Sequence, residues 1–526
     1  METNKPFLTV ENITVRLRDQ LFLKNSFWQI RSDQHWAILG PNGSGKSTLV
    51  RSLWGGVPLQ SGRIVYDLTS HQMEPQLIPQ KDEIGYVSFE LQQSLMEHEA
   101  FQEDLREYAG RTEEVTTARD VIFSGILANR TITPVDEERF LKVVDHLGIQ
   151  YLLQKSIGSL STGEVRKTLI ARALIKSPRL LILDEPFDGL DERSRATLAE
   201  SINRLMTGPM RVILVVHRLE EIVLNITHVL LVKEGQLFMQ GPKDEILTSE
   251  NISRLYGFNL HLERTNRGFR VSYGSEKSDK IDTSVVYEES LQDVPEVLIE
   301  MKDTTVQYDD LIVLDRLNWS MRRGENWAIL GTNGSGKSTI VKLILGDNLQ
   351  GYANQVMLFG KRKGSGEILW EIKRHIGAVS SELQVQHRKK MSAYDVITSG
   401  FYDSIGLYRY PTPKQKKIVD GWIELLKIGD ISNQPYHQLS YGQKRMILLA
   451  RAMVKSPPLL IMDEPCHGLD ISNRRRILRI IEMIGGTPTQ LLYVTNHRDE
   501  IPNCITHVMR LHKGKVLSQG RKEDIL

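Results

Sequence analysis

The apolar positions in the first half of the chain follow two different patterns. Residues 7–17 and 21–30 alternate enough between apolar and polar positions to predict an antiparallel pair of strands that covers the start of the core. Trp36–Leu39, Leu180–Leu183 and Val212–Val216 are instead short and continuously apolar. Such runs are typical of a parallel sheet, in which both faces of each strand are covered.

Helical patterns fill the segments between these strands. A helix is predicted over Ser47–Leu53, and Leu95–Lys155 is rich in Glu, Leu, Arg and Ala without a long strand signal, which predicts a helical subdomain. Leu160–Ile175 begins with two residues suited to a helix N-cap, Ser161 and Thr162. Its apolar positions recur at helical spacing and are Val165, Leu169, Ile170, Ala173 and Leu174.

The same order of elements returns in the second half. IGYVSFELQ at Ile84–Gln92, which predicts a strand running into a polar loop, recurs as IGAVSSELQ at Ile376–Gln384. An apolar strand begins again at Trp327, a helix pattern at Leu439 and a further strand at Leu459. The chain is therefore predicted to contain two domains that are copies of one plan.

Differences in spacing and composition set the predicted boundaries. The copies lie 292 positions apart at the polar loop (380 − 88) but 275 apart at the next helix (395 − 120), so the first half holds about 17 more residues, around Met96–Thr112. Residues 259–273 predict a hairpin that turns at Asn266-Arg267-Gly268, and the stretch that follows predicts a flexible connector. The predicted division is a first domain at 1–258, a hairpin and linker at 259–295, and a second domain at 296–526.

The composition is that of an ordinary water-soluble protein and excludes several other classes of protein. With 526 residues the chain is too long for one core, and its net charge of +2 neither requires nor forbids an acidic partner. Two cysteines exclude a disulfide framework and favour a reducing, cytoplasmic location. No apolar run approaches the roughly 18 residues of a membrane span, and the first residues do not resemble a signal peptide. Short basic runs such as Arg474-Arg475-Arg476 are interpreted as solvated faces.

A phosphate-binding motif occurs once in each half. GPNGSGKST and, 291 positions later (331 − 40), GTNGSGKST both follow an apolar strand and precede a helix. In this pattern the glycines let backbone N–H groups surround a phosphate chain, the lysine reaches the β- and γ-phosphates, and the following serine ligates Mg²⁺. A nucleotide and Mg²⁺ are therefore the predicted ligands. The predicted loop residues are Gly40, Pro41, Asn42, Gly43, Ser44, Gly45, Lys46, Ser47 and Thr48, and Gly331, Thr332, Asn333, Gly334, Ser335, Gly336, Lys337, Ser338 and Thr339.

Paired carboxylates follow a predicted strand in each half, where open α/β sheets bind their ligands. Because neighbouring side chains on a strand point to opposite sides, Asp184 is expected to face Mg²⁺ and Glu185 the attacking water. Asp463 and Glu464 repeat the pair. Two histidines that follow a third strand, His217 and His497, are the predicted hydrogen-bond donors to a γ-phosphate.

The succession of phosphate loop, helical insert, LSTGE or LSYGQ, apolar-DEP, GLD and histidine resembles that of the ATP-binding-cassette (ABC) ATPases. More narrowly, LSTGEVRKTLI, LILDEPFDGLD and GYANQVMLFGKRKGSGE resemble tandem ABC proteins associated with molybdate transport. The resemblance implies an α/β fold of two P-loop NTPase domains, each with a core parallel sheet, an antiparallel β subdomain and a helical subdomain. It also implies ATP hydrolysis and a head-to-tail pairing in which each signature helix closes over the other domain's nucleotide. The signature residues are Ser161, Gly163 and Glu164, and Ser440, Gly442 and Gln443.

Three positions depart from the family pattern. The aromatic residue that stacks on adenine is matched by Tyr308, whereas the first half has Leu17 there, unless Phe22 substitutes. The loop glutamine that senses the transport partner is replaced by Phe89 and Ser381. Its candidate substitutes are Glu90 and Glu382, or Gln92 and Gln384. Glu164 stands where the first signature usually has glutamine.

These features favour one functional hypothesis over two others. Two full catalytic sets without a membrane segment favour an ATPase that docks under separate permease subunits, at the inner face of the cytoplasmic membrane. The competing hypothesis is an ATPase that acts on the ribosome or other nucleic acid, against which the short connector of mixed charge argues. A regulatory ATP sensor is the third hypothesis, and no residue pattern names a transported cargo.

Overall fold

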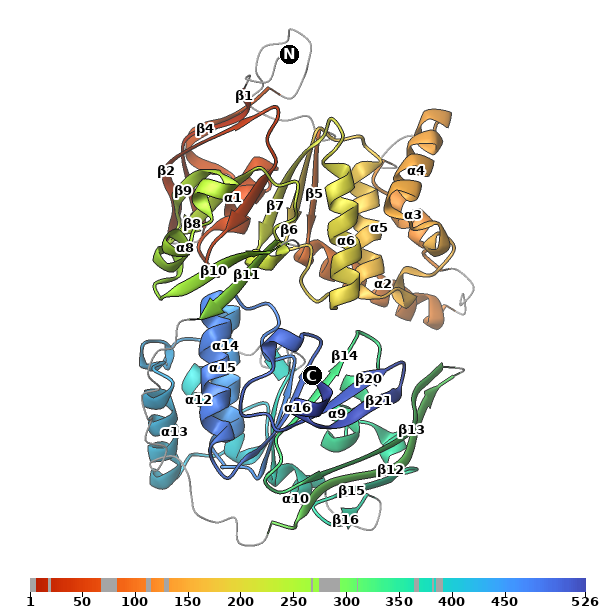
Figure 1. Ribbon diagram of the computed structural model, residues 1–526, viewed down its shortest axis with the longest axis vertical. Coiled ribbons are helices and arrows are strands. Elements are labelled where there is room, and N and C mark those ends of the chain that lie inside the picture. The colour runs from red at the N-terminus through yellow and green to blue at the C-terminus, as the bar shows by residue number, and fades with distance from the viewer. Residues whose placement is uncertain are drawn as a thin grey trace. The chain divides into compact units, whose positions relative to one another are not determined.

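The computed structural model describes residues 6–17, 20–67, 83–109, 115–126, 132–265, 268–273, 294–309, 311–363, 369–380, 383–384 and 391–526. The chain forms two compact units, Met1–Glu276 and Lys277–Leu526, here called unit 1 and unit 2 (Figure 1). Each unit is described separately. Among the described residues no helix is both long and apolar enough to cross a lipid bilayer.

Two sheets form the framework of unit 1. The larger has the order β5-β6-β7-β3-β8-β9, in which every neighbouring pair is parallel except β8 and β9. The smaller is antiparallel, with the order β2-β1-β4. Their strands are β1 (Pro6–Leu17), β2 (Gln20–Arg31), β3 (Trp36–Leu39), β4 (Leu59–Tyr66), β5 (Ile84–Ser88), β6 (Leu180–Asp184), β7 (Arg211–Val216), β8 (His228–Lys233) and β9 (Gln236–Pro242).

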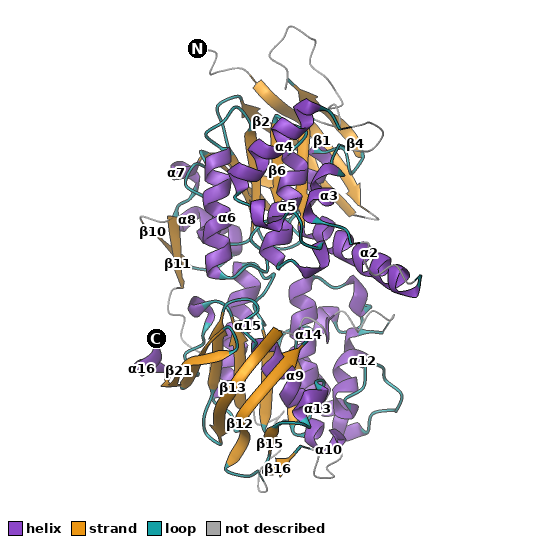
Figure 2. Cartoon of the chain, turned by 90° about the vertical axis from the view of Figure 1, so that its right-hand side faces the viewer, coloured by secondary structure: helices purple, strands orange, loops and turns teal. Residues whose placement is uncertain are grey.

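Helices cover both faces of the larger sheet in unit 1. Helix α1 shares one apolar core with the antiparallel sheet and with β3, β6, β7 and β8. On the other side α5 contacts α3, α4 and α6 (Figures 1 and 2). The helices are α1 (Lys46–Leu53), α2 (Phe89–Tyr108), α3 (Ala118–Phe123), α4 (Pro134–Leu147), α5 (Thr162–Leu174), α6 (Glu192–Leu205), α7 (Lys243–Ile246) and α8 (Ser249–Tyr256).

Unit 2 repeats this plan. Its sheets have the orders β17-β18-β19-β14-β20-β21 and β13-β12-β15-β16. The strands are β12 (Val297–Tyr308), β13 (Leu311–Arg322), β14 (Trp327–Gly331), β15 (Gln355–Leu358), β16 (Lys361–Arg362), β17 (Ile376–Val379), β18 (Leu459–Asp463), β19 (Gln490–Thr495), β20 (His507–His512) and β21 (Lys515–Arg521). The helices are α9 (Lys337–Leu345), α10 (Leu369–Arg374), α12 (Ala393–Thr398), α13 (Pro413–Leu425), α14 (Tyr441–Met453), α15 (Ile471–Gly485) and α16 (Lys522–Ile525).

The two cores of unit 2 show why both patterns of apolar residues occur. One core joins α9 to the antiparallel sheet and to one face of the parallel strands. The second core joins helices α12, α13, α14 and α15 to the opposite face of those strands. Strands of the central sheet are therefore apolar at successive positions, whereas β13 alternates between buried and exposed residues from Leu317 to Arg322. The predicted fold class is confirmed.

Two local predictions were wrong. The run Arg474-Arg475-Arg476 was interpreted as a solvated face, but Arg474 and Arg475 are buried in α15. Ile84–Gln92 was expected to run from a strand into a polar loop, but β5 ends at Ser88 and α2 begins at Phe89. The reason is local, because Ser88 Oγ accepts a hydrogen bond from the N–H of Leu91 (3.2 Å) in the manner of a helix cap. The residues that lengthen the first half around Met96 extend this helix to Tyr108.

The predicted hairpin after the first domain is present as β10 (Leu260–Thr265) and β11 (Gly268–Tyr273). These strands contact α8 and the 3₁₀ helix η3 (Leu219–Glu221), so the hairpin packs within unit 1. Asn266 and Arg267 at the predicted turn, and residues 274–293 of the predicted connector, lie outside the described residues.

In each unit a buried polar side chain directly precedes the central strand, β3 or β14, and hydrogen-bonds to the backbone of neighbouring segments. In unit 1 this is His35, whose Nδ1 accepts a hydrogen bond from Val212 N (3.2 Å) while Nε2 lies 3.0 Å from Met206 O. In unit 2 Asn326 takes the same place, with Oδ1 accepting from Leu491 N (2.9 Å). These partners require a neutral imidazole, because a protonated Nδ1 cannot accept. Burial, reinforced by the charge of Arg211, lowers the pKa of His35 to about 4.

The neutral state of His35 makes unit 1 sensitive to acid. An unfolded histidine binds its proton below about pH 6.5, whereas folded His35 does so only below about 4. Its contribution to stability is therefore complete above pH 6.5 and is lost as the pH falls towards 4. At pH 5.5 the expected loss is about 1.4 kcal/mol relative to pH 7.5. Thermal unfolding of the full chain at both pH values should show a smaller loss in His35→Asn, which copies Asn326; equal losses in the two proteins would contradict this assignment.

Candidate nucleotide-binding sites

The phosphate loop of unit 1 connects β3 to α1. Gly43 and Gly45 have φ values of 77° and 102°, which only glycine adopts without strain. A Cβ atom at Gly40 would lie 2.1 Å from the carbonyl oxygen of Val232, so any side chain there would displace β8. Unit 2 repeats the conformation, with φ of 72° at Gly334 and 101° at Gly336. In both units the backbone at the N-terminus of a helix is left open to a ligand.

The lysine of each loop is held inside its own loop. Lys46 is 4% exposed, and its Nζ donates to the carbonyl oxygens of Gly40 (2.8 Å) and Pro41 (3.0 Å). Lys337 makes the same pair of bonds, to Gly331 (2.8 Å) and Thr332 (3.0 Å). A buried ammonium group beside open backbone N–H groups is a strong anion site.

The loop serines show that the residues fit a phosphate group. The Oγ atoms of Ser44 and Ser335 are buried and have no hydrogen-bond partner among the described residues. Buried hydroxyl groups without partners are rare in native proteins, so these two atoms indicate a missing polar ligand. No cluster of three His, Cys, Asp or Glu side chains suited to a metal occurs in the described part of the chain. A Mg²⁺ ion would therefore depend on the phosphates as well as on protein oxygens.

The carboxylate of Asp184, the predicted Mg²⁺ ligand of unit 1, lies beside the phosphate loop. Its Oδ1 accepts a hydrogen bond from Ser47 Oγ (3.3 Å), and its Oδ2 accepts one from Tyr86 OH (3.1 Å). Asp184 is 5% exposed, and its burial next to the charge of Glu185 raises the pKa of the Asp184 carboxyl. Ser47 and Asp184 are thus brought together as predicted, while the contribution of Tyr86 was missed. The ring of Tyr86 also stacks on that of Trp54, with the two ring centroids 4.9 Å apart.

Glu185 is directed differently from what the strand periodicity suggested. Its φ of 55° takes it out of β6, while its N–H still donates to Val215 O (3.0 Å). The separation of the two carboxylates therefore comes from a left-handed backbone turn and not from strand alternation. One oxygen of Glu185 lies 2.7 Å from His217 Nε2.

The Glu185 and His217 side chains shift each other's protonation. Burial alone would raise the pKa of Glu185, but the charge and hydrogen bond of His217 outweigh it and lower that pKa. Burial likewise would lower the pKa of His217, but Glu185 raises it. The result is a largely buried ion pair beside the phosphate loop, and His217 Nδ1 has no hydrogen-bond partner within the described part of the chain. A phosphate oxygen is a suitable acceptor for this imidazole.

Unit 2 places a different side chain after the third strand. The parallel register pairs Leu39 with Val216 in unit 1 and Leu330 with Thr495 in unit 2. The residue that follows β19 directly is therefore Asn496, whereas His497 lies one position further. Asn496 Nδ2 donates to Asn333 Oδ1 of the phosphate loop (3.3 Å). The N–H of His497 donates to Thr495 Oγ1 (3.1 Å).

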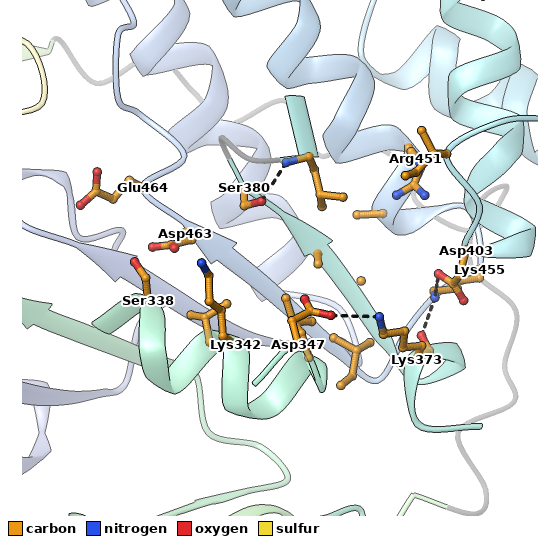
Figure 3. Close-up of a pocket in the computed structure, with 18 residues that line it drawn as sticks. Ser338, Lys342, Asp347, Lys373, Ser380, Asp403, Arg451, Lys455, Asp463 and Glu464 are labelled. Carbon is orange, nitrogen blue, oxygen red and sulfur yellow. Dashed lines mark hydrogen bonds and ion pairs between the residues drawn. The ribbon is translucent and has the colours of Figure 1, made fainter. Parts of the chain in front are cut away.

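The other carboxylates of unit 2 line a cavity. Ser338, Asp463 and Glu464 stand at one end of a space of about 590 Å³, and Lys373, Asp403 and Lys455 at the other (Figure 3). Glu464 repeats the left-handed turn, with a φ of 48°. Its carboxylate has no hydrogen-bond or ion-pair partner among the described residues, in contrast to that of Glu185.

The signature helices begin as the sequence predicted. Ser161 is the N-cap of α5, and the Glu164 carboxylate accepts from Ser161 N (2.9 Å) to complete a capping box. Ser440 and Gln443 form the same box at α14, with 2.8 Å from Ser440 N to Gln443 Oε1. The side chains of Glu164 and Gln443 thus hold their own helix ends. A Cβ atom at Gly442 would lie 2.6 Å from the side chain of Asn473, which would then have to move.

The candidates for the family's loop glutamine lie in different surroundings. Glu90 is exposed and pairs with Arg51 (3.1 Å). Gln92 is buried, and its Oε1 accepts from Arg166 Nε (2.6 Å), while Arg166 Nη1 donates to Glu185 O (2.8 Å). The network that joins α2, the signature helix and the catalytic strand was not predicted, although the arginine of LSTGEVR signals it. Ser381 and Glu382 lie outside the described residues.

The two candidate adenine contacts also differ. Tyr308 is 49% exposed at the end of β12, and its OH accepts from Asn348 Nδ2 (2.9 Å), which fixes the ring. Leu17 lies at the matching end of β1 and offers no ring. Phe22 is partly buried against the core, and its Cδ1 would lie 3.4 Å from a Cβ atom at Gly45. An aromatic ring therefore does lie beside the first phosphate loop.

Comparisons with known proteins agree with this geometry. The family model described as ABC transporter matches residues 23–188 and 314–467. The ABC transporter ATP-binding protein ModF of Escherichia coli (strain K12) is 38% identical over 498 residues, which cover 94% of either chain. An uncharacterized ABC transporter ATP-binding protein of Schizosaccharomyces pombe is 26% identical over 94% of this chain and 95% of its own.

One solved structure resembles the whole chain in fold. It is the archaeal ribosome recycling factor bound to a ribosomal stalk protein, with 18% identity and a TM-score of 0.56 over 98% of this chain and 90% of that one. At this identity the likeness concerns the fold alone. Together with the two matched regions and the ModF similarity, the phosphate loops and paired carboxylates show that the chain belongs to the ABC transporter family and is an ATPase with two ABC domains in tandem.

Proposed function

We propose that the chain is the energy-coupling ATPase of an ABC importer and works with separate membrane subunits. The observation that carries the proposal is the presence in each unit of a phosphate loop, a buried lysine and a pair of carboxylates beside it. Its similarity to ModF, named as an ABC transporter ATP-binding protein, extends over nearly the whole chain and supports the transport context. The cargo implied by the resemblance is a molybdate-type anion or a similar small solute, and the permease would select it.

In unit 1 the described residues divide the work of hydrolysis. The triphosphate of ATP would take over the hydrogen bonds that Lys46 Nζ now makes to its own loop. Ser47 and Asp184 would hold Mg²⁺, which when bound neutralises charge on the phosphate oxygens. Glu185 would orient and deprotonate the attacking water once His217 turns from it towards the γ-phosphate. Catalysis then consists mainly of positioning and of charge stabilisation.

Communication with a partner is proposed to run through the signature helices. The family resemblance implies that Ser161, Gly163 and Glu164 complete the nucleotide site of unit 2, and Ser440, Gly442 and Gln443 that of unit 1. The N-terminus of α5 supports this role, because a capped helix start offers N–H groups to an anion. Opening and closing of that contact with hydrolysis would move a docked permease.

A second candidate is an ATPase that acts on the ribosome. The likeness in fold to the archaeal ribosome recycling factor over the whole chain favours it as the alternative. A regulatory ATP switch is the third candidate, because Phe89 replaces the family's loop glutamine and begins a helix in unit 1. Copurification distinguishes these candidates.

Removing both catalytic carboxylates should separate ATP binding from hydrolysis. Glu185→Gln combined with Glu464→Gln keeps the phosphate loops and is expected to bind ATP normally. Hydrolysis should fall by a factor of about 10² to 10⁴, the usual contribution of general-base catalysis. Phosphate release and equilibrium binding of ATP measure the two effects. Glu250→Gln with Glu523→Gln, at exposed positions, is the control; continued turnover in the first protein would remove the assigned base.

The exposed ring of Tyr308 should determine how tightly unit 2 binds adenine. Tyr308→Ala is expected to raise the Kd for ATP about ten- to a hundredfold, since stacking on a base contributes roughly 1 to 3 kcal/mol. Binding is measured in a Lys46→Ala background so that unit 2 is observed by itself. Tyr308→Phe should retain most of the affinity. Leu17→Ala, measured in a Lys337→Ala background, should change the Kd little, and equal losses at both sites would contradict the assigned difference.

Copurification decides between the importer and the ribosome. The tagged protein, captured from solubilised membranes in parallel with and without ATP, is expected to retain an integral membrane protein with several spans, identified by mass spectrometry. The Lys46→Ala/Lys337→Ala protein tests whether capture responds to nucleotide. Salt-sensitive cosedimentation with ribosomes, with no membrane protein captured, would instead favour the second candidate.

A further inference from the structure

The residue that follows the third core strand differs in chemistry between the units. His217 can carry a proton and lies 2.7 Å from the carboxylate of Glu185. In the same register position unit 2 has Asn496, an amide that cannot carry a charge, and its Nδ2 donates to Asn333 Oδ1 of the loop. A carboxamide can donate to a bound phosphate but cannot exchange a proton with the catalytic glutamate. The second site is therefore built to contact phosphate and lacks the charged partner of the first.

The support of the metal-binding carboxylate differs as well. In unit 1 Asp184 is held from two sides, by Ser47 and by the OH of Tyr86, whose ring stacks on Trp54. Tyr86 lies opposite Ile182 in the sheet, and the residue opposite Ile461 in unit 2 is Ala378.

The other member of the aromatic stack is also replaced. Trp54 follows Lys46 by eight positions (54 − 46), and Leu345 follows Lys337 by the same number (345 − 337). Leu345 and Ala378 both line the cavity of about 590 Å³ that reaches Asp463 and Glu464 (Figure 3). The second pair of carboxylates thus adjoins open space where the first adjoins a packed aromatic pair.

A third difference concerns the arginine of the signature helix. Arg166 bonds to Gln92 and to the carbonyl oxygen of Glu185, so it fixes the backbone of the catalytic residue. Its counterpart Arg445 donates to Tyr441 OH (3.1 Å) on its own helix. The amide oxygen of Gln384, the counterpart of Gln92, is buried without a hydrogen-bond partner among the described residues. The predicted adenine contact differs in the opposite sense, because the stacking residue Tyr308 belongs to unit 2.

We infer that the two sites have different tasks: the site of unit 1 hydrolyses ATP in each cycle, and the site of unit 2 retains its ATP through many cycles. This inference rests on the proposed ATPase function. At the first site the water oxygen bonds to the γ-phosphorus, and the bond from that phosphorus to the β–γ bridging oxygen breaks. The electron pair leaves with ADP, and Glu185 takes the proton of the water and returns it to phosphate. Tyr86 and Arg166 are positioning residues for this step, and Asn496 makes the second site slow.

Single-site variants of the full chain measure the division. Glu185→Gln should lower kcat for ATP at least tenfold more than Glu464→Gln does. After incubation with ATP labelled at the α- or the γ-phosphate and rapid desalting, the wild-type protein should retain about one nucleotide per chain, with both labels in equal amounts. Equal losses of kcat in the two variants, or retained nucleotide without the γ label, would overturn the inference. A wild-type protein without any hydrolysis would instead refute the proposed function itself.

Exchanging the two residues tests the cause. His217→Asn, in a Glu464→Gln background, should lower the first site's kcat about tenfold or more and increase retention of γ-labelled ATP there. Asn496→His, in a Glu185→Gln background, should raise turnover of the second site about tenfold and shorten the retention of ATP there.

Tyr86→Phe keeps the stacked ring but removes the hydrogen bond to Asp184. This variant should weaken Mn²⁺ binding at the first site, which electron paramagnetic resonance measures in a Lys337→Ala background. Loss of second-site turnover in His497→Ala, with no gain from Asn496→His, would assign the role to His497 and refute the inference.

Discussion

Parallel pairing at the centre of each large sheet is the constraint on which both candidate sites depend. In unit 1, β3 pairs with β7 and β7 with β6, so the chain leaves all three strands at one edge of the sheet. The phosphate loop leaves from β3, the two carboxylates from β6 and His217 from β7. Residues more than a hundred positions apart thereby come within hydrogen-bond distance, as Ser47 and Asp184 show. A slip of one residue in any of these pairings would direct the side chains to the wrong side of the sheet.

Charge at this edge is arranged for an anion that carries its own metal ion. Asp184 is buried next to the partly exposed Glu185, and burial together with the charge of Glu185 raises the pKa of the Asp184 carboxyl. Glu185 is kept ionised by His217 and by the nearby charges of Lys46 and Arg166. Lys46 in turn donates to two loop carbonyl oxygens, at Gly40 and Pro41, that a phosphate group can replace. The site therefore offers a cation to a phosphate chain and carboxylates to a metal ion that accompanies it.

Sequence patterns predicted most of this architecture because the residues that bind phosphate are contiguous. Nine successive residues make the loop, and continuous apolar runs mark the buried strands, so both could be recognised from local pattern. What could not be predicted depends on contacts between distant segments. Tyr86 looks like an ordinary core position, and although the motif LSTGEVR singles out Arg166, only the folded chain places the two side chains against Asp184 and the Glu185 carbonyl. The strand register likewise distinguishes Asn496 from His497, since both follow the same apolar run.

Comparison of the two units separates what phosphate binding requires from what catalysis requires. The loop glycines, the lysine with its two carbonyl bonds, the left-handed turn at the glutamate and the capping box of the signature helix are the same in both. The two units differ in the side chains that pair with the carboxylates or hold the carboxylate residues in place. A nucleotide can be bound with the first set alone, because backbone N–H groups and one cation supply most of the attraction. Hydrolysis also needs the carboxylates held still and correctly protonated, and that second requirement is where the two halves of this chain have diverged.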